Sequence, residues 1–256
     1  MYRPRIIPVL LLKNKHLIKT RKFKEDRYIG DPINAIRIFN ESFADELIVL
    51  DIYATRENRC ISSELVRLLN DETNMPFGVG GGIKNCHQIM ELIQAGAEKV
   101  IIGSEAYFNP KFINEAANRF GSSTIMVCID VKNDFWGKPK VYVNNGKHAT
   151  GKTPLEFAKY MEQMGAGELI IQSIERDGEM NGYDVALLEK ITSSIQIPVV
   201  ALGGAGTIEH FTELYSRVQV NGLAAGSFFI YNDKNRGVLI NYPGKKICEQ
   251  LSLITK

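Results

Sequence analysis

The sequence lacks long apolar runs, paired cysteines and an excess of charge of either sign. No apolar run approaches the roughly 20 residues that a membrane-spanning helix needs. The four cysteines do not have the spacing of a disulfide framework or a zinc site. The apolar stretch "IIPVLLL" near the N-terminus is short, and no small-residue cleavage site follows it, as one would follow a secretory signal. We therefore expect a reduced, cytoplasmic protein with no metal or cofactor.

The charges nearly balance, with 31 Lys and Arg against 29 Asp and Glu. This balance argues against a general nucleic-acid binder or a membrane-surface protein. One stretch differs, because "KNKHLIKTRKFK" (13–24) has six basic residues and no acidic one. It could be a solvated loop or an electropositive lid over an anionic ligand. The four histidines are dispersed and have no metal-ligand spacing.

Short runs rich in Ile, Val and Leu alternate with amphipathic segments along the whole chain. The amphipathic segments begin at Asp31-Pro32, Asn109-Pro110 and Thr153-Pro154, each a capping side chain followed by proline at the first helical position. This alternation predicts a single (β/α)8 barrel over residues 1–256, with an open doubly wound sheet as the alternative. The apolar runs lie near 5–12, 46–51, 76–80, 99–103, 124–130, 168–173, 197–202 and 220–225.

The two halves of the sequence resemble each other. "ADELIVLDI" (44–52) corresponds to "AGELIIQSI" (166–174), and "MPFGVGGGI" (75–83) corresponds to "IPVVALGGAG" (197–206). The spacing of the strands repeats in the same way. We therefore predict two half-barrels, of about residues 1–120 and 121–256. Within the second half, "VNNG" (143–146) predicts a hairpin turn, so the loop after the first strand of that half forms a small covering ribbon.

Glycines and small hydroxyl residues come directly after several strands, at the end of the barrel where ligands bind. Backbone N–H groups beside glycine can approach an anion closely. One glycine-rich turn alone would indicate only a turn, but the pattern occurs in both halves. It predicts two phosphate sites and a long substrate with a phosphate at each end. The residues are Gly81, Gly82, Gly103 and Ser104 in the first half, and Gly203, Gly204, Gly226 and Ser227 in the second.

Each half of the chain begins with an equivalent strand, near 5–12 and 124–130, but only the second of these ends in a carboxylate. The halves align Asp130 with Leu11, so an acid–base pair at the strand ends would lack one member. Asp51 and Asp177 lie at or just after two other strands. They could bind substrate hydroxyls, or they could form turns and helix caps.

Four charged residues precede strands at the opposite end of the barrel. They are Arg5, Glu46, Lys99 and Glu168. Two cations and two anions at one mouth can form a closed layer of salt bridges. Charged residues also border strands in many proteins, and that simpler interpretation stays open at this point.

Several motifs resemble those of the HisF family, the cyclase subunit of imidazole glycerol phosphate synthase. They are "DELIVLDI", "VGGGI", "ERDGEMNGYD" and "GGAGTIEHF", and the similarity runs nearly end to end. The resemblance implies a (β/α)8 barrel that binds a doubly phosphorylated ribosyl-aminoimidazole-carboxamide. It also implies that a HisH-type glutaminase docks at the N-terminal face and that ammonia passes through the barrel.

The resemblance assigns roles unevenly. Asp130 matches the catalytic base, and Lys19 and Phe23 match a mobile first loop that contacts substrate. Arg5, Glu46, Lys99 and Glu168 match the gate of the ammonia channel. The departures lie at the ligand-binding end, where Leu11 replaces the second catalytic aspartate and Gly78, Gly103, Gln172 and Leu202 replace small polar residues or Asn.

This pattern is similar to HisF-type paralogues that accompany sugar-modifying amidotransferases in surface-polysaccharide pathways. We therefore expect a synthase subunit that supplies ammonia to an amidination step. A genuine cyclase of histidine biosynthesis and a non-catalytic barrel that binds phosphorylated metabolites are the alternatives.

Overall fold

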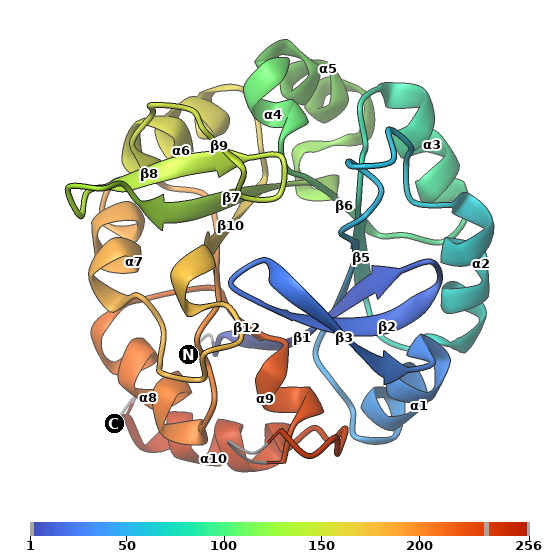
Figure 1. The fold of residues 1–256 in the computed structure, drawn as a ribbon, viewed down its shortest axis with the longest axis vertical. Coiled ribbons are helices and arrows are strands. Elements are labelled where there is room, and N and C mark those ends of the chain that lie inside the picture. The colour runs from blue at the N-terminus through green and yellow to red at the C-terminus, as the bar shows by residue number, and fades with distance from the viewer. Residues whose placement is uncertain (1–2, 233–235, 255–256) are drawn as a thin grey trace.

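Eight parallel strands close into a barrel in the computed structural model, which describes residues 3–232 and 236–254. The first strand pairs with the last, and β7 pairs with β10, so the sheet is closed (Figure 1). The closure confirms the (β/α)8 barrel and excludes the open sheet. The strands are β1 (Arg5–Lys13), β4 (Leu47–Asp51), β5 (Phe77–Gly80), β6 (Lys99–Ile102), β7 (Ile125–Asn133), β10 (Glu168–Ser173), β11 (Val199–Leu202) and β12 (Gly222–Ala225).

Helices surround the barrel as an outer ring (Figure 1). The main ones are α1 (Pro32–Glu41), α2 (Ser63–Glu72), α3 (Cys86–Gln94), α5 (Pro110–Phe120), α6 (Pro154–Gln163), α7 (Val185–Thr192), α8 (Ile208–Arg217) and α10 (Gly244–Ile254). Short helical turns lie between them: α4 (Glu105–Phe108), α9 (Ser227–Ile230), and the 3₁₀ turns η1 (Ser122–Thr124) and η2 (Ile174–Arg176). None of the helices in the described ranges is long and apolar enough to cross a membrane.

All three predicted helices begin at their proline, and two of the three predicted capping side chains form hydrogen bonds. Asp31 accepts a hydrogen bond from the backbone of Ile33, and Thr153 forms a reciprocal capping box with Glu156. At Asn109 only the capping interaction was predicted wrongly, because its side chain makes no capping hydrogen bond. Asn109 ends α4 as well as preceding α5, and its backbone has φ −135° and ψ 74°, so the preceding turn sets its conformation.

Two apolar layers hold the barrel together. The larger one packs the outer faces of the strands against the helices. The smaller one fills the barrel interior and includes Ile7, Val9, Ile48, Ile101, Met126, Ile170, Val200 and Ala224. Because alternate residues of each strand face opposite sides, most strands contribute apolar residues to both layers, whereas β5 presents Gly78 and Gly80 to the interior. The barrel centre is therefore a packed apolar core.

An antiparallel hairpin extends the first strand of each half at the C-terminal mouth. β2 (His16–Arg21) and β3 (Lys24–Gly30) follow β1, and β8 (Pro139–Val143) and β9 (His148–Ala149) follow β7. The basic stretch thus forms a hairpin that lies across the mouth in Figure 1. Asn144 and Asn145 have φ of 53° and 57°, as a tight hairpin turn requires. The half-barrel boundary near residue 120 stays a prediction.

Candidate functional site

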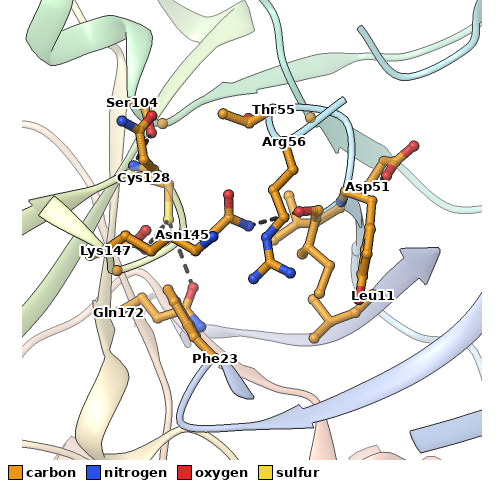
Figure 2. A pocket seen from close by; sticks show the side chains of 18 of the residues that line it. Leu11, Phe23, Asp51, Thr55, Arg56, Ser104, Cys128, Asn145, Lys147 and Gln172 are labelled. Carbon is orange, nitrogen blue, oxygen red and sulfur yellow. Dashed lines mark hydrogen bonds between the residues drawn. The ribbon is translucent and has the colours of Figure 1, made fainter. Parts of the chain in front are cut away.

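A cavity of about 580 Å³ opens at the C-terminal mouth of the barrel. Its floor is formed by strand ends, and its walls come from the loops after β4, β5, β6 and the β8–β9 turn. Figure 2 shows Arg56, Asn145 and Lys147 around the cavity, with Leu11 and Gln172 at its lower side. Its volume falls in the range typical of small-molecule sites.

Asp130 lies on β7 at this cavity and is half-buried. Burial raises the pKa of Asp130 to about 7. The thiol of Cys128, with Sγ 3.6 Å from Oδ1, opposes that rise by donating a hydrogen bond, whereas the Asp177 carboxylate adds to it. A carboxyl group with a pKa near neutrality can both accept and release a proton at physiological pH. Asp130 therefore has the properties of a general base.

Leu11 lies at the C-terminal end of β1 and lines the same cavity. It is only 5% exposed and packs in the interior apolar layer. An isobutyl side chain carries no proton that it could transfer. If the site performs acid–base chemistry, this strand end does not supply the second group.

The carboxylate of Asp51 accepts hydrogen bonds from residues of the loop that follows it. One carboxylate oxygen accepts from the backbone N–H groups of Tyr53 and Ala54 at 3.0 and 3.1 Å, and the other accepts from Arg59 at 2.6 Å. These are the contacts of a turn, which the sequence left as one of two interpretations. Sequence reasoning missed Arg59, because nothing in "TRENRC" indicates which arginine turns back to the strand end.

Asp177 attaches the β2–β3 hairpin to the opposite side of the mouth. Its carboxylate lies 3.3 Å from Lys19 Nζ and accepts from the hydroxyl of Thr20 at 3.0 Å. Lys19 is buried, and its ammonium group points into the barrel mouth near Gly226. Phe23, at the tip of the hairpin, lines the large cavity. The hairpin thus contributes to both sides of the mouth.

The paired glycines after β5 and β11 are required by close backbone packing. Gly81 and Gly82 have positive φ, and a Cβ on Gly82 would lie 1.9 Å from the carbonyl oxygen of Arg59. Gly203 and Gly204 repeat this arrangement, and a Cβ on Gly204 would lie 2.0 Å from the carbonyl oxygen of Gly182. These contacts account for the four glycines through loop packing. A role in phosphate binding stays a prediction.

The two predicted hydroxyl groups have different surroundings. The Ser104 hydroxyl accepts from the backbone N–H of Asn144 at 2.8 Å at the large cavity. In the second half, the hydroxyl oxygen of Ser227 is buried and has no hydrogen-bond partner among the described residues. A Cβ on Gly226 would lie 2.8 Å from Lys19 Nζ, whereas one on Gly103 would meet nothing within 4 Å. The two halves therefore do not form equivalent sites.

The four charged residues at the N-terminal mouth contact one another in a closed ring. Arg5 forms ion pairs with Glu46 and Glu168, and Lys99 Nζ lies 3.0 and 2.9 Å from the same two carboxylates. Both glutamates are buried. Each carboxylate bridges two cations, so the ring seals this end of the interior apolar layer.

Other groups at the large cavity were not identified from the sequence. Arg56 lies over the Tyr53 ring, and Lys147 and Asn145 come from the β8–β9 turn, which sequence reasoning treated only as a hairpin. Asn145 donates to the backbone carbonyl of Ile52 at 2.7 Å and so fixes the turn against the loop after β4. No group of three or more potential metal ligands occurs within residues 3–232 and 236–254.

Comparisons with known proteins identify the family of the chain. Residues 5–235 match the histidine biosynthesis protein family. A Pseudomonas aeruginosa protein, provisionally named imidazole glycerol phosphate synthase subunit hisF2, is 46% identical over 95% of this chain and 97% of its own length. A Leptospira interrogans protein, provisionally named as the HisF subunit, is 43% identical over 98% of this chain and 99% of its own. The HisF subunit of Alkaliphilus metalliredigens is 36% identical over 91% of this chain and 92% of its own.

Proposed function

Because the chain belongs to the histidine biosynthesis protein family, as a HisF-like synthase subunit, we propose that it conducts ammonia for a two-component glutamine amidotransferase. In this proposal a HisH-type glutaminase docks at the N-terminal face and releases ammonia there. The ammonia enters through the ring of Arg5, Glu46, Lys99 and Glu168. It leaves at the C-terminal mouth.

The closed ring above an apolar interior is the observation that carries the proposal. The ring lies at the N-terminal end of the apolar interior, so a molecule that enters the barrel from that face meets the ring first. Uncharged ammonia can enter an apolar interior at a modest free-energy cost, whereas ammonium would lose its hydration without a counter-ion. An interior of this kind selects the reactive, neutral form.

The other end of the barrel supports an acceptor outside this chain. Leu11 lines the cavity at the position where the resemblance places one of two acid–base groups for ring closure. Losing a general acid costs about a hundred- to ten-thousandfold in rate. We therefore assign the ammonia to an amidination step on a sugar, held by a separate amidotransferase. The resemblance to paralogues of surface-polysaccharide pathways supports this assignment.

Cyclisation within this barrel is the second candidate. One specific observation favours it, because burial raises the pKa of Asp130 to about 7, as suits a base that works at neutral pH. In that case a bound water or a substrate group would take the place of the missing acid. The ammonia route through the ring would be the same for both candidates.

Copurification with a HisH-type glutaminase from the same genome tests the proposal. We expect a stable heterodimer and at least about a tenfold increase in glutamine hydrolysis when this chain is present, as expected for coupled subunits. Turnover of the doubly phosphorylated substrate with free ammonium, measured on the same preparation, separates the two candidates. Failure to form any complex with the glutaminase contradicts both.

A further inference from the structure

Two separate compartments, rather than one groove, lie at the C-terminal mouth. The larger measures about 580 Å³, and the smaller, between the ends of β10, β11 and β12, measures about 20 Å³. Among the described residues, only Leu11 and Gln172 line both. These two side chains therefore form the wall between the compartments.

The wall is buried and uncharged. Leu11 is 5% and Gln172 is 6% exposed, and they come from β1 and β10 on different sides of the barrel. Gln172 is paired in register with Asp130 on one side and with Leu202 on the other, which places it between the two compartments. Its amide oxygen lies 3.9 Å from Cys128 Sγ, a contact drawn in Figure 2.

The small compartment contains its own cation. The ammonium of Lys19 enters it, close to Gly226, and the Asp177 carboxylate neutralises that charge at 3.3 Å. A space of about 20 Å³ holds about one water molecule. A phosphate group does not fit there while Lys19 and the wall keep their positions, and the unpartnered hydroxyl of Ser227 can be satisfied by such a water.

The large compartment has the opposite character. Arg56, Lys132 and Lys147 line it, and none of them forms an ion pair with the described residues. Gly103 leaves open space in front of the strand end. Phe23 adds an apolar surface. Five carboxylates also line this compartment, and two of them, Asp26 and Asp51, already pair with Lys13 and Arg59. Cations that lack an ion pair beside an apolar wall suit an organic ligand that carries one anionic group.

We propose that Leu11 and Gln172 restrict the ligand of this barrel to one with a single phosphate, of the size of a pentose or hexose phosphate. The phosphate lies among the cations of the large compartment, and the sugar lies toward the wall and Asp130. The wall excludes an extended ligand with a phosphate at each end. This inference goes beyond the proposed function, which places the ammonia acceptor on a separate protein, and concerns a ligand that this barrel itself binds.

Titration calorimetry on the full chain tests whether the wall excludes a second phosphate. The affinities of ribose 5-phosphate and ribulose 1,5-bisphosphate are measured and compared. We expect ribose 5-phosphate to bind at least about tenfold more tightly than the bisphosphate. In the double variant Leu11→Ala/Gln172→Ala the two compartments merge, so affinity for the bisphosphate should rise by about tenfold or more relative to affinity for ribose 5-phosphate, whose sugar loses its contact with the wall. Leu202→Ala is the matched control, because it enlarges the small compartment without removing the wall.

Three results would overturn the inference. They are tighter binding of the bisphosphate to the unmodified chain, no binding of either probe at about 10 mM, or an unchanged affinity ratio in a double variant with native circular dichroism. If the double variant does not fold, Gln172→Ser alone removes half of the wall and should change the ratio in the same direction. Stimulation of the glutaminase, measured on the same proteins, reports on the proposed function independently.

Discussion

The ammonium of Lys19 and the carboxylate of Asp177 lie 3.3 Å apart, and both groups are buried at the barrel mouth. Thr20 Oγ1 donates to the same carboxylate at 3.0 Å, and the backbone N–H of Lys22 donates to the Asp177 carbonyl oxygen. Asp177, in the loop that follows β10, therefore attaches the whole β2–β3 hairpin to the barrel. The large cavity depends on this contact for its wall at Phe23.

Asp177→Ala should release the hairpin. A buried Lys19 without its partner is destabilising by about 3–5 kcal/mol, so the hairpin should open rather than keep the ammonium buried. Hydrogen exchange over residues 16–30 should become faster than in the unmodified protein. Glu179→Gln is the control, because it removes only the ion pairs of Glu179 with the half-exposed Arg21 and Lys22, which should cost about 1 kcal/mol or less. Equal protection of the hairpin in both variants would contradict this role of Asp177.

Lys99→Met should destabilise the protein through the charged ring. Glu46 and Glu168 are buried and would then share Arg5 as their remaining cation in the ring. We expect a loss of about 3 kcal/mol in the free energy of unfolding, measured in urea.

Arg37→Met provides the comparison for the ring. Arg37 forms a bidentate but solvent-exposed ion pair with Glu72, with N–O distances of 2.9 and 2.8 Å. Solvent screening limits such a pair to about 1 kcal/mol or less. If the free energy of unfolding falls equally in both methionine variants, the ring stabilises the fold no more than an exposed ion pair does.

Asp130→Asn should change how stability depends on pH. The pKa of Asp130 is raised from 3.8 to about 7, so between these values the folded protein binds more protons than the unfolded chain. Stability contributed by this group is therefore present below about pH 4 and is lost as pH rises toward 7. The asparagine variant should gain on the order of 4 kcal/mol over the unmodified protein at about pH 8 and almost nothing at about pH 4. Urea denaturation at both pH values checks this, and a gain that is independent of pH would exclude the carboxyl as its source.

Leu11→Asp together with Gln172→Thr should give more cyclisation than Leu11→Asp alone. The single variant introduces a carboxyl group at the strand end but leaves Gln172 in the proposed wall, which would still hinder a doubly phosphorylated substrate. We expect at least about a tenfold higher rate with free ammonium in the double variant. Gln172→Thr alone controls for access without the acid. Equal rates in the single and double variants would mean that access is not limiting.

Gly82→Ala and Gly103→Ala form a matched pair at neighbouring strand ends. An added Cβ at Gly82 would clash with the Arg59 carbonyl oxygen at 1.9 Å, in a backbone with φ 66°. The loop after β4 would have to move, and we expect a loss of about 3 kcal/mol or more. At Gly103 nothing lies within 4 Å of the new methyl group, so stability should change by less than about 1 kcal/mol. Thermal unfolding of both variants is the measurement.

The sequence was sufficient for the barrel but not for the details of its mouth. Strands such as "LIVLD" are apolar on both faces, and that pattern alone indicates burial between helices and a barrel interior. The strand β3 has no such pattern, because its residues are mostly exposed and charged, so only its pairing with β2 makes it a strand. The wall joins Leu11 and Gln172 from strands far apart in the chain, and no local pattern predicts how their volumes meet. The partner of Asp51 was missed for the same reason.

A closed barrel exposes no strand edge to solvent, but the two hairpins bring edges back. Among the described strands, β3 and β9 lie at the ends of the pairing order. An unpaired edge can add strands from other molecules and start aggregation. β9 is only two residues long, and β3 begins with Lys24, Glu25, Asp26 and Arg27, all exposed. Four adjacent charges and one very short strand should make both edges poor templates, so the mouth can carry two hairpins without promoting self-association.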